Sequence, residues 1–171
     1  MGVRYNTPEA FARQLREGHY NELRVALYFM LEGAWVRIGY VDQRYDLSVR
    51  FPGRRAFSVE VKWDKRADET GNLYFEVENT RQGRPSGIMA TTADYWCHVI
   101  GEAGAEALLV PVARLRSFLQ EGNFRCRPTR GEDSNSRGMI VPREALAQLS
   151  GGKWIILPTV EEFFGQVFRK G

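Results

Sequence analysis

The chain has 171 residues, 43% of them hydrophobic and 26% charged, with a net charge of +3. These values fit one globular domain and exclude wholesale disorder, and no apolar run reaches the ~18 residues that a membrane span needs. Two cysteines and two histidines form no recognisable zinc motif. The first residues lack the apolar stretch of a secretory signal. We therefore expect a cytoplasmic protein, or one in the host cytoplasm if the source is viral, with reduced thiols.

The first part of the chain predicts two helices. Thr-Pro-Glu at 7–9 is typical of a helix start, and Gly18 is expected to end that helix. Residues 21–32 are apolar nearly all round, which predicts a second, buried helix. Glu22 is the exception, at the N-terminal end of this second helix.

Three strand-like runs follow, and the second and third carry the clearest pattern in the chain. Residues 34–40 form a short, mixed run. In residues 45–51 and 57–63 apolar and polar side chains alternate strictly, which is typical of strands with one buried face. The Pro-Gly-Arg-Arg stretch at 52–55 predicts a turn between them. The two strands should therefore form an antiparallel hairpin.

The rest of the chain predicts more strands and helices around this hairpin. Loops are expected at 64–72 and 79–92, and an Arg-, Ser- and Asn-rich mobile loop at 123–138. Strands are expected at 73–77, 95–100, 107–112 and 154–157, and helices at 113–120, 142–149 and 160–168. This order predicts a single α/β domain with a central mixed β-sheet flanked by helices.

The polar face of the hairpin carries two carboxylates and a lysine. Pairing across the turn places Asp46 opposite Glu60 or Lys62, so the carboxylates are direct or diagonal neighbours, roughly 5 to 8 Å apart at Cβ. Carboxylates this close repel each other unless a cation lies between them, and oxygen ligands suit Mg²⁺, with Mn²⁺ as a substitute. Lys62 can stabilise negative charge on a phosphate at the same spot. Ordinary cross-strand ion pairs on a solvated strand face are the alternative.

The order of these residues resembles the PD-(D/E)XK nuclease superfamily. Tyr-Asp at 45–46 precedes Glu-Val-Lys at 60–62, and the glutamate follows the aspartate by fourteen residues. The resemblance covers about residues 20–100, and Tyr45 stands where the name-giving proline would be.

This resemblance implies a restriction-endonuclease-like core and a set of roles. Asp46 and Glu60 would be metal ligands, and Lys62 the catalytic lysine. Glu22 would be the helix acid that several branches of the superfamily add to the metal site. The implied activity is a metal-dependent endonuclease that hydrolyses DNA phosphodiesters.

Size and the early helix acid are similar to those of phage and archaeal Holliday-junction resolvases. That similarity implies a structure-selective enzyme that cuts branched DNA as a homodimer. One alternative is a non-catalytic module, binding nucleic acid or protein, on a nuclease-like scaffold. Another is a small-molecule enzyme with one Mg²⁺, which leaves the arginine-rich loops unexplained.

Arginines occur in pairs in three stretches that are expected to be loops. Each pair is a candidate for phosphate contacts, and solvated loop charge is the alternative. The pairs are Arg54 with Arg55, Arg81 with Arg84, and Arg125 with Arg127.

A second polar concentration follows the hairpin. Glu76 and Glu78 alternate along one expected strand and share a face. If this strand pairs beside 57–63, one of the two acids can join the metal site; a solvated edge strand is the alternative. Asp94 opens the next strand and is expected to support the site without touching the metal.

Overall fold

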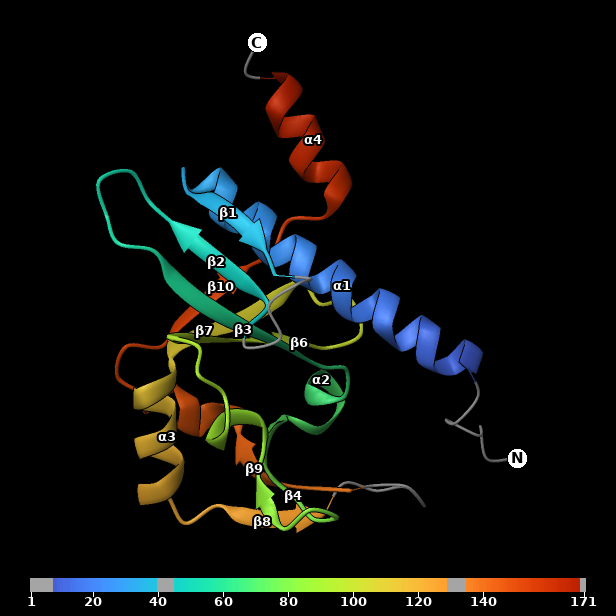
Figure 1. The fold of residues 1–171 in the computed structure, drawn as a ribbon, viewed down its shortest axis with the longest axis vertical. Helices are drawn as coiled ribbons and strands as arrows, with labels where there is room; N and C mark the ends of the chain where they lie inside the picture. Colours follow the sequence, from blue (N-terminus) through green and yellow to red (C-terminus); the bar gives the residue numbers. More distant parts are fainter. Residues whose placement is uncertain (1–7, 40–44, 129–134, 170–171) are drawn as a thin grey trace.

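The computed structural model describes residues 8–39, 45–128 and 135–169, which form two β-sheets and four α-helices (Figure 1). The central sheet has six strands in the order β1-β2-β3-β6-β7-β10, and the second sheet has four in the order β5-β4-β9-β8. The central strands are β1 (Trp35–Ile38), β2 (Leu47–Arg50), β3 (Phe57–Asp64), β6 (Tyr95–Ile100), β7 (Glu106–Pro111) and β10 (Lys153–Ile156). The second sheet contains β4 (Asn72–Asn79), β5 (Arg84–Pro85), β8 (Arg125–Pro128) and β9 (Ser136–Pro142).

Four α-helices accompany the sheets, and the first of them packs on one face of the central sheet. They are α1 (Pro8–Leu31), α2 (Ala67–Thr70), α3 (Val112–Glu121) and α4 (Val160–Arg169), with the 3₁₀ turns η1 (Gly87–Met89) and η2 (Arg143–Gln148). No helix in the described ranges is long and apolar enough to cross a membrane.

The central sheet is mixed, as the sequence predicts. β1, β2 and β3 form an antiparallel meander, whereas β3 pairs with β6 in parallel. Parallel neighbours require a crossover connection, because the chain must return to the same end of the sheet. Here the crossover contains α2, β4, β5 and η1, so it also supplies two strands of the second sheet.

Two hydrophobic cores lie on opposite faces of the central sheet. On one face Val25 and Phe29 of α1 pack in one cluster with Val59 of β3. On the other face Trp96 of β6 packs in a second cluster with Phe75 of β4. Because side chains alternate along a strand, β3 directs its valines at α1 and its charged side chains toward the second sheet.

One long helix replaces the two helices that the sequence predicts. α1 runs through Gly18 without a break, so the expected helix end at this residue is wrong. A single glycine inside a helix costs only about 1 kcal/mol relative to alanine. Packing of the apolar second half of α1 against the central sheet outweighs that cost.

Most of the predicted strands are confirmed, and three predicted loops are partly wrong. The segment 64–72 contains α2, 79–92 contains the short strand β5, and 123–138 contains β8 and the start of β9; residues 129–134 lie outside the described part. The sequence allowed a β4 acid to join the metal site if β4 paired beside β3. That pairing does not occur, because β6 pairs with β3, and β4 pairs with β9 in the second sheet.

Candidate functional site

The hairpin of β2 and β3 places Asp46 beside Glu60. The strands pair Leu47 with Val59, and Asp46 stands directly before β2, at the end of this ladder. The Asp46 amide donates to the Val59 carbonyl (3.1 Å), and the Val61 amide donates to Asp46 Oδ2 (2.7 Å). These bonds hold the Asp46 carboxylate beside Glu60, so of the two neighbours that the sequence allows for Asp46 the ladder favours Glu60 over Lys62.

Glu60 is held between a lysine and a threonine. Lys62 Nζ lies 2.6 Å from Glu60 Oε1, and Thr91 Oγ1 donates to Glu60 Oε2 over 3.4 Å. The Glu60 side chain is 16% exposed and that of Lys62 46% exposed. Strand alternation places both on the same face of β3, as the sequence predicts, and Thr91 reaches them from the segment after η1.

The carboxylates repel one another at this site. Burial, and then the negative charge of Glu60, raise the pKa of Asp46 from 3.8 to about 6. The hydrogen bond from Val61 and the charge of Lys62 act in the opposite direction, and the charge of Glu22 adds to the rise. Asp46, Glu60 and Glu22 are therefore near enough to compete for positive charge.

Lys62 keeps its proton in this environment. Burial alone would lower its pKa, but Glu60, through its charge and the hydrogen bond, and then Asp46 and Glu76 outweigh that effect. The net result is a pKa raised above the ordinary 10.5. A permanently charged lysine among acids can offset negative charge that a substrate brings.

Glu22 lies near this pair but has a different partner. Its Oε2 is 2.9 Å from His19 Nδ1, one turn earlier on α1. Within the described ranges no group of three or more His, Cys, Asp or Glu side chains is arranged to hold a metal ion. The carboxylates that the hairpin itself brings together are thus two, Asp46 and Glu60.

A cleft of about 1940 Å³ opens between the two sheets and contains part of this site. Glu60 and Lys62 line it from the central sheet, while Glu76, Arg125 and Arg127 line it from the second sheet. The cleft therefore brings acidic and basic groups from distant parts of the sequence to face one another.

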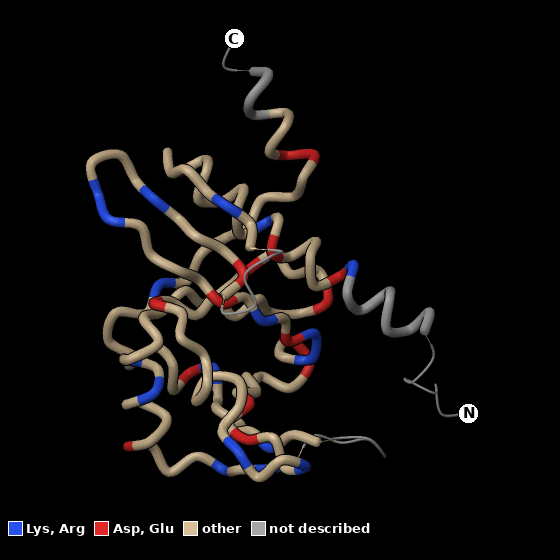
Figure 2. The backbone as a smooth tube through the Cα atoms, viewed as in Figure 1, with Lys and Arg blue, Asp and Glu red and all other residues tan. Residues whose placement is uncertain are grey.

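Only one of the three arginine pairs lines this cleft. Arg54 and Arg55 are exposed in the turn at the outer tip of the β2–β3 hairpin, and they are not part of the lining. Figure 2 shows basic residues at this tip and others on the second sheet, at separate ends of the molecule. Arg125 and Arg127 lie on strand β8 and not in a loop, which corrects the expectation for this pair.

The remaining arginine pair and the two acids of β4 do not form one cluster. Arg81 and Arg84 are exposed around the turn that leads into β5 and do not line the cleft. Glu78 pairs with Arg137 on the neighbouring strand β9. Glu76 is half-buried and faces the cleft, so of the two β4 acids it is the one near Lys62.

Asp94 has a structural role at the start of β6. Its Oδ2 accepts hydrogen bonds from the Ser58 amide (2.7 Å) and the Ser58 hydroxyl (3.0 Å). The Asp94 amide donates to the same hydroxyl over 3.0 Å. These bonds hold the beginnings of β3 and β6 together and place Asp94 away from the cleft lining.

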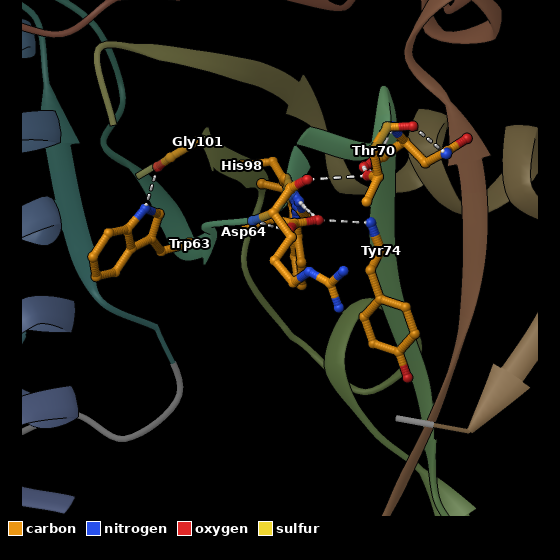
Figure 3. A network of polar contacts seen from close by, with 9 residues as sticks. Trp63, Asp64, Thr70, Tyr74, His98 and Gly101 are labelled. Atoms are coloured by element: carbon orange, nitrogen blue, oxygen red, sulfur yellow. Dashed lines mark hydrogen bonds and ion pairs between the residues drawn. The ribbon is translucent and has the colours of Figure 1, made fainter. Parts of the chain in front are cut away.

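The sequence analysis missed a polar network at the inner end of the cleft (Figure 3). Asp64 Oδ2 accepts a hydrogen bond from the Tyr74 amide (2.9 Å) and lies 3.6 Å from His98 Nε2. Trp96 Nε1 donates to His98 Nδ1 over 3.1 Å, so the neutral ring of His98 carries its proton on Nε2, toward Asp64. The signal for Asp64 was present, because it continues the alternation of Glu60 and Lys62; His98 becomes visible only from the pairing of β6 with β3.

Comparison with known proteins assigns no family. No family model and no curated protein sequence matches the chain. The solved structure of a bacterial homing endonuclease is similar over 72% of this chain and 75% of that one, with a TM-score of 0.48 and 18% sequence identity. A likeness of this size does not assign an activity, so the chemistry of the site has to be argued from its own residues.

Proposed function

We propose that this chain is a metal-dependent endonuclease that hydrolyses phosphodiester bonds in DNA. The observation that carries the proposal is the hairpin geometry. Asp46 lies beside Glu60, and Lys62 Nζ is 2.6 Å from Glu60 Oε1, at a cleft with unpaired arginines on its other wall. Paired carboxylates with a lysine and nearby cations suit hydrolysis of a polyanion.

The residues present fit Mg²⁺ or Mn²⁺. Mg²⁺ is commonly bound by one or two carboxylates together with waters and substrate phosphates, so two acids suffice. Asp46 accepts a hydrogen bond from the Val61 amide at Oδ2. Burial, and then the charge of Glu60, raise the pKa of Asp46, and a cation bound there would offset both effects. Asp46 and Glu60 would hold the ion, and Glu22 is the candidate for additional support. When bound, the ion supplies Lewis acidity for phosphodiester hydrolysis.

The protein groups have separate tasks in this proposal. Lys62 remains protonated and offsets the negative charge that grows on the phosphate during hydrolysis. Thr91 orients Glu60 through the hydrogen bond to Oε2. Arg125 and Arg127 supply affinity for the phosphate backbone, which should weaken steeply with salt.

We further propose that the enzyme acts on branched DNA as a homodimer. Cutting two strands of a junction at related positions requires two sites, which a symmetric pair of chains supplies. Light scattering on the purified protein measures the molar mass in solution and so distinguishes a monomer from a dimer. A monomer that cuts only isolated strands would remove both parts of this narrower proposal and leave the nuclease in place.

The decisive experiment compares cleavage of a labelled four-way junction, a linear duplex and a single strand, in Mg²⁺ and in EDTA. Asp46→Ala, Glu60→Ala and Lys62→Ala should abolish cleavage while DNA binding changes little. Glu121→Ala, which removes an exposed acid at the end of α3, is the matched control and should cut like the wild type. Circular dichroism of each variant verifies folding.

Each outcome of this experiment has a distinct meaning. Paired cuts confined to the junction, lost in EDTA and in the three variants, would support the full proposal. Cleavage of all substrates would keep the nuclease and remove the junction selectivity. Binding without cleavage by folded protein, in Mg²⁺ and in Mn²⁺, would favour the non-catalytic nucleic-acid-binding module.

A further inference from the structure

Strand β8 has a property that the other basic segments lack. Arg125 and Arg127 are both exposed and both line the cleft. Neither side chain makes a hydrogen bond or an ion pair within the part of the chain that the structure describes. Because the two residues are two positions apart on one strand, their side chains share a face and lie roughly 7 Å apart along the strand.

The other cations of the cleft are already engaged. Lys62 is paired with Glu60, and Lys65 Nζ lies 2.6 Å from Glu17 Oε2. Paired charges add little attraction for an incoming polyanion, whereas unpaired cations in a concave site attract one strongly. The pair on β8 is therefore the main source of free positive charge on the wall opposite Glu60.

The shape of the cleft indicates what it can hold. At about 1940 Å³ it exceeds the ~300–1,000 Å³ typical of small-molecule sites, so it can take several units of a polymer. Glu60 lines the cleft, and its side chain is only 16% exposed. A phosphate that reaches Glu60 has to enter the cleft between the two sheets, and a single strand, which is narrower than a duplex, does so more readily.

We propose that the cleft binds one unpaired DNA strand, with successive phosphates on Arg125 and Arg127 and the phosphate to be cut at Glu60 and Lys62. This inference rests on the proposed function and narrows its substrate to unpaired strands, such as the opened arms of a branched DNA. The position of β8 in the cleft then determines how far along the strand the cut phosphate lies from the phosphates bound by Arg125 and Arg127.

The test is a salt titration of binding in EDTA, where no cleavage occurs. The probe is a fluorescently labelled single-stranded oligonucleotide, and its hairpin duplex of the same sequence is the second arm. Each phosphate contact on a single strand contributes about 0.7 to the slope of log K against log salt. The double variant Arg125→Gln/Arg127→Gln should lower the slope by about 1.4 and weaken binding about tenfold or more at moderate salt.

The chain offers a matched control with the same change in net charge. Arg54→Gln/Arg55→Gln removes two exposed arginines that do not line the cleft, and its slope should equal that of the wild type. Equal losses in both double variants would show that net charge alone governs binding and would overturn the proposal. A duplex that binds as tightly as the single strand and depends equally on β8 would overturn it too.

The two proposals fail in different ways. If the nuclease proposal is wrong, no cleavage appears in Mg²⁺, yet the β8 variant still loses its salt slope with single strands. If the strand proposal is wrong, cleavage appears, and its KM responds no more to the β8 variant than to the hairpin-tip control.

Discussion

Asp64 joins the two sheets, which makes its substitution a sharp test of the structure. The residue ends β3, and its Oδ2 accepts the Tyr74 amide of β4 over 2.9 Å. Its Oδ1 accepts the Arg66 amide over 3.2 Å, and Oδ2 lies 3.6 Å from His98 Nε2. The side chain is only 16% exposed, so water replaces these partners poorly.

The magnitude follows from the bonds that are lost. A hydrogen bond to a charged group contributes about 1.5–3 kcal/mol, and a buried donor left without an acceptor costs about 1–3 kcal/mol. The Tyr74 amide is partly buried, whereas the Arg66 amide reaches water and costs less. Asp64→Ala should therefore lower the free energy of unfolding by about 2–4 kcal/mol, and Asp64→Asn, which keeps an acceptor, by about 1–2 kcal/mol.

The effect should depend on pH in one direction. Burial alone would raise the pKa of Asp64, but the nearby His98 ring and the Tyr74 and Arg66 amides outweigh it, and the pKa is lowered. A carboxyl group with a depressed pKa stabilises the fold above its unfolded value, about 3.9, and loses this contribution as pH falls through the folded value. The difference between wild type and Asp64→Asn should be large at pH 7 and small at low pH.

Urea unfolding at pH 7 and at pH 3 measures both quantities. Asp68→Asn, a change at an exposed aspartate of α2, is the control and should differ from the wild type by less than about 0.5 kcal/mol. An Asp64→Asn variant as stable as this control at pH 7 would refute the role of Asp64. So would a stability difference of equal size at both pH values.

Three further substitutions test other parts of the structure. Thr91→Val removes the hydroxyl that reaches Glu60 and accepts the Ala93 amide, so we expect a several-fold lower kcat and a loss of only about 1 kcal/mol in unfolding, both restored by Thr91→Ser. An unaltered kcat would show that Glu60 needs no orientation. Gly87→Ala places a Cβ 2.4 Å from a main-chain oxygen of β4 at a φ of +51°, and we expect a loss of about 1–3 kcal/mol in thermal or urea unfolding. Gly53→Ala has a similar φ of +68° but open space, so an equal loss there would contradict the steric reason. Arg24 is only 3% exposed and donates to two carbonyls just before α4 and to the Ala103 carbonyl between β6 and β7. Arg24→Met leaves all three without this donor, and urea unfolding should show a loss of about 2–5 kcal/mol; a loss below about 1 kcal/mol would contradict this role.

Local pattern predicted the hairpin and its polar face well. Strict alternation over 45–51 and 57–63 is sufficient because side chains of a strand point to opposite faces with a period of two. The prediction failed where a local signal competes with packing. Gly18 indicates a helix end by itself, yet α1 continues through it because the following apolar turns pack on the central sheet.

The Arg-rich segment around 125–127 shows the opposite error. Its composition is typical of a loop, yet it forms β8 because β9 offers an edge with which it can pair. Edge pairing depends on main-chain hydrogen bonds to a partner strand more than on the side chains of the segment itself. Composition alone could not reveal it.

The sequence by itself determined that Asp46, Glu60 and Lys62 share one face of a hairpin, since that follows from neighbouring residues. Only the tertiary structure decided the register that brings Asp46 beside Glu60 and the choice of β6, not β4, beside β3. It alone decided which arginine pair faces the acids. Those choices depend on contacts between segments far apart in the chain, whose free energies no local pattern encodes.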